Sequence, residues 1–427
     1  MSGIVQNNIL RSSGTIAVSA AGLNWVDTVI TGSTVTVEAG NGYWVNTTSN
    51  TCTITLPSEA ESGDQIVIID YARTWGTNKI IIDSNGLNYQ GNDDTYTVEY
   101  TTDGQSLNIV YSDATKGWLP LEDDVVADEP VAPPTQKGAF AYGFVNAGSE
   151  VNVKNLVNSS GVVAADVTGV GTARAYSSAC SYGGDKGIFG FGANLNGTSK
   201  TGITNLMNNS GVIATDTSGV GLARANCGAA GYGVGLAIFA FGDPAASGHT
   251  GVSNLVNSSG VVASDTSAVG TVRTMVEGIR YGVDTAVLGY GTLTNDAGQN
   301  ILNKVSNVGV VASDSTGAGT GRGSLAACSY GGDKGIFGYG TGDTNVTNLI
   351  NNLGNASADV SGVGTARNNL SATNYGGDKG LFGYGLSGST NQSMTNLVNN
   401  LGVVASDTTG VGTGRVTPSA CGYSYSA

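Results

Sequence analysis

The sequence predicts an all-β protein made of many short strands that are joined by tight turns. Charged residues are only 12% of the 427 residues, while Gly, Asn, Ser and Thr fill the gaps between short apolar runs. No long stretch of the sequence places apolar residues at helical spacing. Several residue types also recur over residues 137–427 at a period near 50, which is typical of repeat architectures.

Composition and charge narrow the class of protein. Gly (67) and Pro (7) make about 17% of the chain, which is below the share of ~25–30% that marks low-complexity segments, so we expect a folded chain. The formal net charge of −14 argues against binding a nucleic-acid backbone or an anionic membrane, because both would be repelled. The start of the chain lacks a basic region followed by an apolar one, so we expect synthesis in the cytoplasm without a signal peptide and no membrane insertion.

We expect residues 1–121 to form a separate β domain, because the period near 50 residues that marks residues 137–427 is absent from them. Short runs rich in β-branched and aromatic residues are bounded there by turn residues. The runs are TVTVEAG, GYWVNT, TCTITLP, GDQIVIID, NKIIID, YTVEY and SLNIVYS. Residues 122–136, EDDVVADEPVAPPTQ, are acidic and hold three of the seven prolines, which indicates an exposed linker.

Residues 137–427 contain an internal repeat with fixed marks. A Tyr recurs at intervals of 50, 49, 49, 45 and 48 residues, and each is preceded eight residues earlier by an Arg. An Asp stands eight residues before each Arg, and an Asn stands eleven residues before each Asp. The tyrosines are Tyr182, Tyr232, Tyr281, Tyr330, Tyr375 and Tyr423. The asparagines are Asn155, Asn205, Asn254, Asn303, Asn348 and Asn396.

One repeat unit predicts four short antiparallel strands, represented by ARAYSSACSY, KGIFGFG, ITNLMNNSG and VIATDTSG. In the second strand, Ile188 is expected on one face, with Phe189 and Phe191 on the other. Four strands at a period near 50 are typical of a propeller blade. The last unit stops after its first strand, and the first unit, from Lys137, lacks that strand. Pairing the two ends completes a six-bladed β-propeller over residues 137–427.

The repeat resembles kelch-type propellers. An Arg opens the first strand, an aromatic residue lies along it, and a hydrophobic second strand ends in Gly. The sequence departs from that pattern because GFG and GYG replace a pair of glycines, and the late Trp is missing. The resemblance implies the architecture and leaves the partner open.

The N-terminal region resembles a small β module of bacteriophage virion proteins. The likeness covers about 120 residues, including AGNGYWVNTTSNTCTITLPSEAESGDQIVIIDYARTWGTNKIIIDSNGLNYQG and LNIVYSDATKGWLP with Trp118. The start MSGIVQNNILRSSGTI is similar to virion structural proteins of cyanophages. The resemblance implies that residues 1–121 anchor the chain to other virion proteins, as a homotrimer, while the propeller faces outward.

The repeated Asp and Arg allow two interpretations. Six arginines could grip an anionic ligand at the axis, or each Asp could form a charge-assisted hydrogen bond with its Arg as a structural pair. We favour structural pairs, because every Arg has its own Asp. The pairs are Asp166 and Arg174, Asp216 and Arg224, Asp265 and Arg273, Asp314 and Arg322, Asp359 and Arg367, and Asp407 and Arg415.

No catalytic, cofactor-binding or metal-binding residue is predicted. His249 is the single histidine and is expected in an exposed loop, so neither a His cluster nor a common triad can form. Cys180, Cys328 and Cys421 recur two residues before the repeat Tyr and are expected to be small buried hydrophobes. The acids outside the Asp position occur in single units, as in Glu150, Glu277 and Asp296.

These observations predict a non-enzymatic phage virion protein, displayed as a tail fibre or a capsid decoration. Its propeller would contact a host-surface glycan or a protein through loops that differ between units, namely ANLNGTSKTG, DPAASGHTG, TLTNDAGQN and TGDTNV. Two alternatives stay open. One is a polysaccharide depolymerase of the phage tail, since two carboxylates suffice for glycoside hydrolysis. The other is a kelch-like scaffold that binds a protein.

Overall fold

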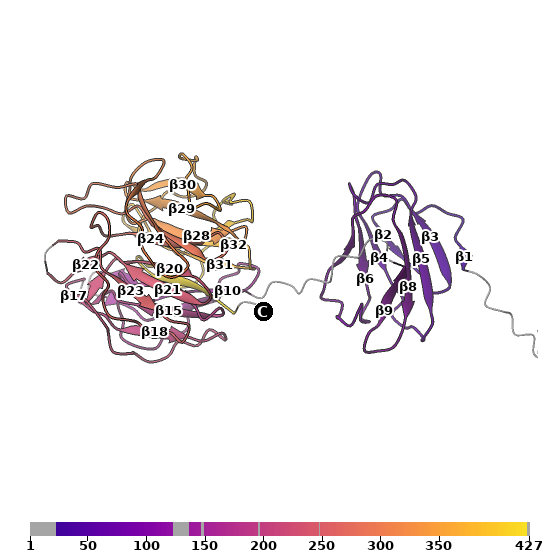
Figure 1. Ribbon diagram of the computed structural model, residues 1–427, viewed down its shortest axis with the longest axis horizontal. Coiled ribbons are helices and arrows are strands. Elements are labelled where there is room, and N and C mark those ends of the chain that lie inside the picture. The colour runs from indigo at the N-terminus through magenta and orange to yellow at the C-terminus, as the bar shows by residue number, and fades with distance from the viewer. Residues whose placement is uncertain (1–22, 123–135, 147–148, 195–196, 247, 425–427) are drawn as a thin grey trace, which may run out of the picture. The chain divides into compact units, whose positions relative to one another are not determined.

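The computed structural model is all-β, as the sequence predicts, and it divides into two compact units, Met1–Pro133 and Pro134–Ala427 (Figure 1). Every regular element among the described residues is a strand. The linker expected over 122–136 lies outside the described residues except for its two end residues. The structure describes residues 23–122, 136–146, 149–194, 197–246 and 248–424.

The first unit consists of two sheets, between which the chain alternates over its first six strands. The strands β1, β3 and β5 pair in parallel in one sheet, as do β2, β4 and β6 in the other, and the remaining pairs are antiparallel. The five-stranded sheet has the order β1 (Asn24–Trp25), β3 (Asn41–Val45), β5 (Gln65–Asp70), β8 (Ser106–Tyr111) and β9 (Trp118–Glu122). The four-stranded sheet has the order β2 (Thr34–Thr36), β4 (Cys52–Thr55), β6 (Ile80–Asp83) and β7 (Val98–Tyr100).

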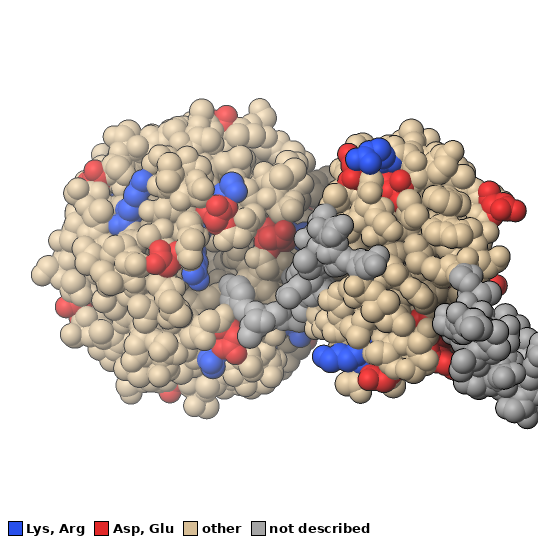
Figure 2. All heavy atoms as spheres, turned by 45° about the vertical axis from the view of Figure 1, so that its right-hand side comes forward, with Lys and Arg blue, Asp and Glu red and all other residues tan. Residues whose placement is uncertain are grey.

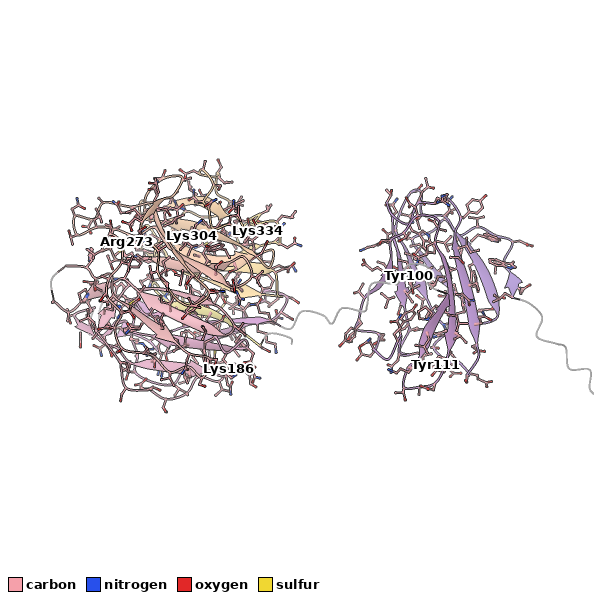
Figure 3. All side chains as sticks on the ribbon, in the orientation of Figure 1. Tyr100, Tyr111, Lys186, Arg273, Lys304 and Lys334 are labelled. Carbon is pink, nitrogen blue, oxygen red and sulfur yellow. The ribbon has the colours of Figure 1, made fainter. Side chains whose placement is uncertain are left out.

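A single hydrophobic core holds the first unit together. Alternate residues of the strands are buried, as in β4, where Cys52 and Ile54 are inaccessible to solvent. The hydroxyls of Tyr89 and Tyr100 form a hydrogen bond of 2.5 Å inside this core. Figure 3 labels Tyr100 and Tyr111, both of which belong to it. Each large apolar side chain that is removed from water contributes roughly 1.5–3 kcal/mol to stability.

The second unit contains six similar sheets, which are numbered 1 to 6 in chain order. Sheet 1 is β13 (Lys154–Val157), β10 (Lys137–Ala141) and β36 (Ser419–Tyr423). Sheet 2 is β14 (Ser178–Tyr182), β15 (Lys186–Gly190) and β18 (Thr204–Met207), and sheet 3 is β20 (Gly228–Tyr232), β21 (Leu236–Ala240) and β23 (Ser253–Val256). Sheet 4 is β24 (Glu277–Tyr281), β25 (Thr285–Gly289), β26 (Ile301–Val305) and β27 (Ser315–Thr316). Sheet 5 is β28 (Ala326–Tyr330), β29 (Lys334–Gly340) and β30 (Thr344–Ile350), and sheet 6 is β31 (Ser371–Tyr375), β32 (Lys379–Gly383) and β35 (Thr395–Val398).

The expected fourth strand is mostly not a regular strand. In five of the sheets this segment joins the third strand only through two isolated bridges, such as Thr204 with Thr217 and Met207 with Ile213 in sheet 2. Only sheet 4 has a short fourth strand, β27. Short extra pairs lie near the loops that follow the second strands: β11 (Phe144–Asn146) with β12 (Ser149–Glu150), β16 (Ala193–Asn194) with β17 (Ser199–Lys200), β19 (Arg224–Ala225) with β22 (Asp243–Pro244), and β33 (Leu386–Ser387) with β34 (Thr390–Asn391).

The two ends of the second unit pair with each other. The terminal strand β36 lies antiparallel to β10, from Lys137 opposite Tyr423 to Ala141 opposite Ser419. The six edge strands β14, β20, β24, β28, β31 and β36 are called the inner strands. Each inner strand contacts the inner strands of two other sheets, in the order β14, β20, β24, β28, β31, β36 and back to β14.

Backbone hydrogen bonds follow the same order. In every sheet, an amide just after the inner strand donates to a carbonyl oxygen in the next sheet. The six bonds run from Gly183 to Gly235 (2.8 Å), Gly233 to Asp284 (2.7 Å), Gly282 to Asp333 (2.8 Å), Gly331 to Asp378 (2.7 Å), Gly376 to Gln136 (2.9 Å) and Ser424 to Asp185 (2.8 Å).

The core of the second unit lies between neighbouring sheets. One cluster joins Ile188 and Phe191 of sheet 2 to Phe239 of sheet 3, whereas Phe189 belongs to a different cluster. The expectation that Phe189 and Phe191 share a face is therefore wrong. The strand β15 ends at Gly190, and Phe191 has a φ of 60°, which breaks the alternation of side chains.

Candidate functional site

The repeated Asn and Asp hold the loop that enters each sheet. In sheet 2, the Asp216 carboxylate accepts hydrogen bonds from Asn205 Nδ2 (2.9 Å), the Thr172 amide (3.1 Å) and Thr172 Oγ1 (2.6 Å). Burial by itself would raise the pKa of Asp216, but these hydrogen bonds outweigh it, so the pKa lies below its usual value. The equivalent donors to the other carboxylates are Thr413 for Asp166, Leu222 for Asp265, Thr271 for Asp314, Thr320 for Asp359 and Thr365 for Asp407.

The expected pairing of each Asp with the Arg eight residues later is wrong. Among the described residues, no ion pair joins members of these pairs. The Asp that interacts electrostatically with Arg174 is Asp216, one repeat later, and not Asp166. The loop between Asp166 and Arg174 crosses from sheet 1 to sheet 2, so a carboxylate of sheet 2 receives it.

Each repeat Arg is buried between backbone and an aromatic ring. The Arg174 guanidinium lies 4.1 Å from the centre of the Tyr142 ring, and Arg224 Nε donates to the carbonyl oxygen of Phe241 at 2.8 Å. Burial lowers the pKa of Arg174. The further Arg and ring pairs are Arg224 and Phe191, Arg273 and Phe241, Arg322 and Tyr290, Arg367 and Tyr339, and Arg415 and Tyr384. All six arginines are at most 2% exposed, and none of them lines a cavity among the inner strands.

A cavity of about 480 Å³, called the wide cavity, lies between the six inner strands. Each inner strand pairs with only one strand of its sheet, and the other edge of some inner strands accepts side-chain hydrogen bonds from a neighbouring inner strand, such as Ser181 Oγ to the Gly422 carbonyl oxygen at 2.8 Å. Small residues line the cavity at the second position of every inner strand: Ala179, Ala229, Gly278, Ala327, Ala372 and Ala420. A volume in this range is typical of small-molecule sites. The cavity reaches the turns that follow the inner strands, at Gly184, Gly235, Gly282, Gly332 and Gly377.

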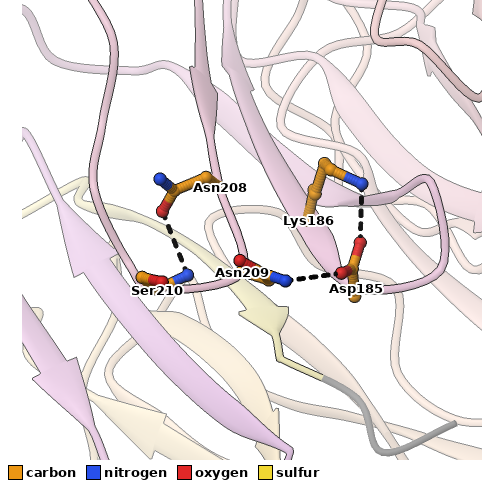
Figure 4. Close-up of polar contacts among 5 residues, drawn as sticks. All are labelled: Asp185, Lys186, Asn208, Asn209 and Ser210. Atoms are coloured by element: carbon orange, nitrogen blue, oxygen red, sulfur yellow. Dashed lines mark hydrogen bonds and ion pairs between the residues drawn. The ribbon is translucent and has the colours of Figure 1, made fainter.

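Polar turns surround that end of the cavity. In Figure 4, the Asp185 carboxylate accepts hydrogen bonds from Lys186 Nζ (2.8 Å) and Asn209 Nδ2 (3.0 Å), while Asn208 Oδ1 accepts one from the Ser210 amide (3.0 Å). The matching Asp and Lys pairs of sheets 5 and 6 are Asp333 with Lys334 and Asp378 with Lys379, both at 2.7 Å. Lys186 and Lys334 are labelled in Figure 3.

The opposite end of the inner strands is constricted. A second cavity of about 40 Å³, called the narrow cavity, lies there and is lined by the residues around the start of each inner strand. Six non-glycine residues in this position have φ between 49° and 57°: Tyr176, Asn226, Met275, Ser324, Asn369 and Thr417. The backbone amide of Asn226 donates to the carbonyl oxygen of Tyr176 at 2.9 Å, and Asn369 donates to Ser324 in the same way at 2.9 Å. The sequence repeat does not predict this left-handed position, because no residue type is kept there and none of the six residues is glycine.

Glu277 lines the narrow cavity as the first residue of β24. Burial raises the pKa of its carboxyl to about 8. The other inner strands begin with Ser178, Gly228, Ala326, Ser371 and Ser419, so this acid occurs in sheet 4 alone.

The variable loops and the chain entry lie at opposite ends of the inner strands. The loops join the second and third strands and lie at the same end of the sheets as the narrow cavity. Neighbouring loops are linked, for example by the ion pair of Lys200 with Asp243 (2.8 Å). The chain enters at Gln136, whose backbone and side-chain oxygens accept hydrogen bonds from Gly376 and Gly377 near the wide cavity, both at 2.9 Å.

The histidine and cysteines form no cluster. All five cysteines are free and buried, as expected for Cys180, Cys328 and Cys421, and burial raises the pKa of Cys180 to about 12. His249 is partly buried and not fully exposed as expected, and its two ring nitrogens have no hydrogen-bond partner among the described residues. Within the described ranges, no group of three or more His, Cys, Asp or Glu could hold a metal ion.

Comparisons with protein-family models and with curated proteins found no match to this chain. In the part of the chain that the structure describes, no helix could cross a membrane.

Proposed function

We propose that the second unit is a six-bladed, kelch-like β-propeller. The support is the sixfold order of contacts and hydrogen bonds among the inner strands, in which Gln136 and Ser424 provide the last two links. Full closure would remove the exposed strand edges that favour aggregation. In this proposal a blade consists of three regular strands and an outer segment that Asp holds in place.

We propose further that the protein is a non-enzymatic virion component of a bacteriophage, displayed as a tail fibre or a capsid decoration. One observation carries the binding role: the repeat keeps its buried Asn, Arg and Tyr and its exposed, hydrogen-bonded Asp in all six units, while the loops at the same end as the narrow cavity change in length and sequence. A rigid frame with variable loops at one end suits recognition, because loops tolerate change without disturbing the packed sheets. The role in the virion rests on the resemblance of the N-terminal region to phage modules.

In this proposal, the first unit attaches the chain to other virion proteins, and the loops of the second unit contact a host-surface glycan or protein. Figure 2 shows Lys, Arg, Asp and Glu in small groups on a surface that is otherwise made of uncharged residues. Such a surface favours recognition through shape and hydrogen bonds over electrostatic attraction. A homotrimer formed by the first unit would present several copies of the loops and raise avidity.

The loops provide the test. The variant Thr294→Ser/Asn295→Gly/Asp296→Gly changes an exposed loop of sheet 4, and Ser112→Ala/Thr115→Ala changes the first unit as a matched control. We expect particles with the loop variant to assemble normally and to adsorb to host cells at least tenfold more slowly. Unchanged adsorption for variants of every loop at this end would overturn the receptor role.

Purified particles and purified protein distinguish this role from the two alternative functions, an intracellular scaffold and a polysaccharide depolymerase. Mass spectrometry of purified particles should detect the protein, and its absence there would favour an intracellular scaffold. Incubation of the purified protein with host polysaccharide should leave the chain length of the glycan unchanged, and shortened products would establish a depolymerase.

A further inference from the structure

Two turns beside the wide cavity carry an exposed valine where the matching turns of other sheets carry glycine. Sheets 2, 5 and 6 have Gly-Gly-Asp between the inner strand and the Lys that begins the second strand, whereas sheets 3 and 4 have Val234 and Val283 in place of the second Gly. These valines are 92% and 84% exposed. The Gly in the other sheets shows that the fold does not require an aliphatic side chain at this position.

The hairpins after the third strands also replace a small residue with an aliphatic one in some of the sheets. Sheets 1, 2 and 3 have a serine before the hairpin glycine, namely Ser160, Ser210 and Ser259. Sheets 4 and 5 instead have Val308 and Leu353 there, which are 69% and 66% exposed. Sheet 6 continues this series with Leu401, which is 72% exposed.

Direct contacts bring these substitutions into one sector of the surface. The backbone carbonyl of Asp284, next to Val283, accepts a hydrogen bond from Gly233, next to Val234, at 2.7 Å. The Asp284 carboxylate also accepts one from Asn307 Nδ2, next to Val308, at 2.9 Å.

The neighbouring hairpin joins this sector through a lysine. Lys304 Nζ on β26 donates to the carbonyl oxygen of Leu353 at 2.7 Å. We call the side chains of Val234, Val283, Val308 and Leu353 the aliphatic patch. Grouped aliphatic side chains on a soluble surface mark interaction sites far more often than single ones do.

Two cations without ion-pair partners accompany the patch. Arg280 is exposed on β24 and donates to the carbonyl oxygen of Val283. Among the described residues, Lys304 donates to Leu353 O and Asn355 Oδ1 alone. Neither forms an ion pair within the described residues, whereas Lys186, Lys334 and Lys379 on the polar turns are each paired with an Asp. Figure 3 labels Lys304 and Lys334 in the second unit.

The charges indicate the chemistry of the partner. The same sector also holds one carboxylate, Asp284, which forms no ion pair among the described residues, so Arg280 and Lys304 leave the sector with a net positive charge. An aliphatic surface of this charge complements a peptide segment that carries aliphatic side chains next to carboxylates. A second copy that docked through the same patch is a poorer occupant, because its Arg280 and Lys304 would face those of the first copy and like charges would repel.

We propose that the aliphatic patch, with Arg280 and Lys304, is a docking site for an acidic, aliphatic peptide segment of a partner protein. The site lies at the end of the inner strands opposite to the variable loops, so it is distinct from the proposed receptor surface. The protein could therefore bind two partners at once. The proposal does not depend on the role in the virion.

A display experiment tests the proposal on the full-length chain. A library of random twelve-residue peptides on yeast is selected against the protein, and the enriched peptides are synthesised with a fluorescent label. We expect them to combine Asp or Glu with Val, Leu or Ile. Their affinity should fall at least tenfold for Val234→Ser/Val283→Ser/Val308→Ser/Leu353→Ser, and at least threefold for Arg280→Gln/Lys304→Gln.

A matched variant controls for general loss of exposed aliphatic residues. Val162, Val212 and Val261 are 62%, 56% and 62% exposed on the hairpins of sheets 1, 2 and 3, which contribute no hairpin residue to the patch, so their triple change to Ser should leave peptide affinity unchanged. Circular dichroism checks that every variant folds. The proposal is overturned if no peptide is enriched, if the enriched peptides lack acids, or if they bind the fourfold serine variant equally well. Self-association of the wild type that this variant abolishes would show that the occupant is a second copy.

Discussion

The backbone amide of Ser424 donates a hydrogen bond of 2.8 Å to the carbonyl oxygen of Asp185. Ser424 follows the last strand of the chain, and Asp185 lies in the turn between the first two strands of sheet 2. The bond therefore ties the C-terminal end of the second unit to a sheet that begins more than 240 residues earlier in the sequence. Its counterpart at the other end is the bond from the Gly376 amide to Gln136.

Ser424→Pro should destabilise the second unit by roughly 1–3 kcal/mol. Proline lacks the amide donor and cannot adopt the φ of 56° that Ser424 has. Ser424→Gly keeps the donor and tolerates this φ, so it should be nearly neutral. A Pro variant as stable as the Gly variant would contradict a structural role of this link.

Tryptophan fluorescence can assign such effects to one unit. All four tryptophans, Trp25, Trp44, Trp75 and Trp118, lie in the first unit. Chemical unfolding of the Pro variant should therefore shift the transition seen by circular dichroism and leave the fluorescence transition in place. A shift of both transitions would mean that the two units unfold together.

Gly187→Ala should destabilise the second unit by about 1–3 kcal/mol through overpacking. A Cβ at this position on β15 would clash with Cys421 Sγ of the neighbouring inner strand. The double variant Gly187→Ala/Cys421→Ala should lose less stability than the two single changes together, because removing the sulfur makes room for the new methyl. Additive losses in calorimetry would show that Cys421 is not what limits the space.

The repeated aspartates should make the second unit sensitive to acid. The pKa values of Asp166, Asp216, Asp314, Asp359 and Asp407 lie below the usual value, because hydrogen bonds outweigh the effect of burial. Their contribution is therefore present above about pH 4, the pKa of an unfolded Asp, and is lost as the pH falls through the folded values.

The test is the free energy of unfolding between pH 2 and 7. It should fall below about pH 4, and Asp216→Asn should cost about 1 kcal/mol at pH 7, at the low end for a charged hydrogen bond because this carboxylate is exposed. Each aspartate removed should flatten the acid dependence, and an unchanged slope would contradict the assignment.

Glu277→Gln should raise the stability of the second unit at alkaline pH. The folded carboxyl has a pKa of about 8, above that of an unfolded Glu. A raised pKa in the folded state means that stability is fully present below about pH 4 and is lost as the pH rises toward 8. The Gln variant cannot ionise, so its melting temperature should exceed that of the wild type at pH 9 and approach it at pH 4.5. Parallel profiles for the two proteins would contradict this prediction.

Local patterns were sufficient to predict much of the fold. The seven runs expected in the first unit correspond to β2 through β8, and the first three strands of a repeat are regular. The pairing of the strand at Lys137 with the terminal strand is also found. The edge strands β1 and β9 were not predicted, since β1 has two residues and β9 contains Pro120, which normally argues against a strand interior.

What the sequence could not show depends on neighbours in space. Asp216 has Thr172 as its partner because the chain crosses between sheets there, and spacing within one unit suggested Arg224 instead. The left-handed Phe191 and Tyr176 were not foreseen, because no glycine marks these positions. The aliphatic patch required the structure, since Val234 and Leu353 lie far apart in the sequence.

The antiparallel pairing of β10 with β36 has a consequence for engineering. Lys137 stands opposite Tyr423, so a short peptide could join the two ends of this unit, and new termini could be opened in the exposed loop between β25 and β26. Such a circular permutant would keep every strand pair while moving the point of attachment to the opposite end of this unit. It would show whether the direction in which the unit is mounted matters for its activity.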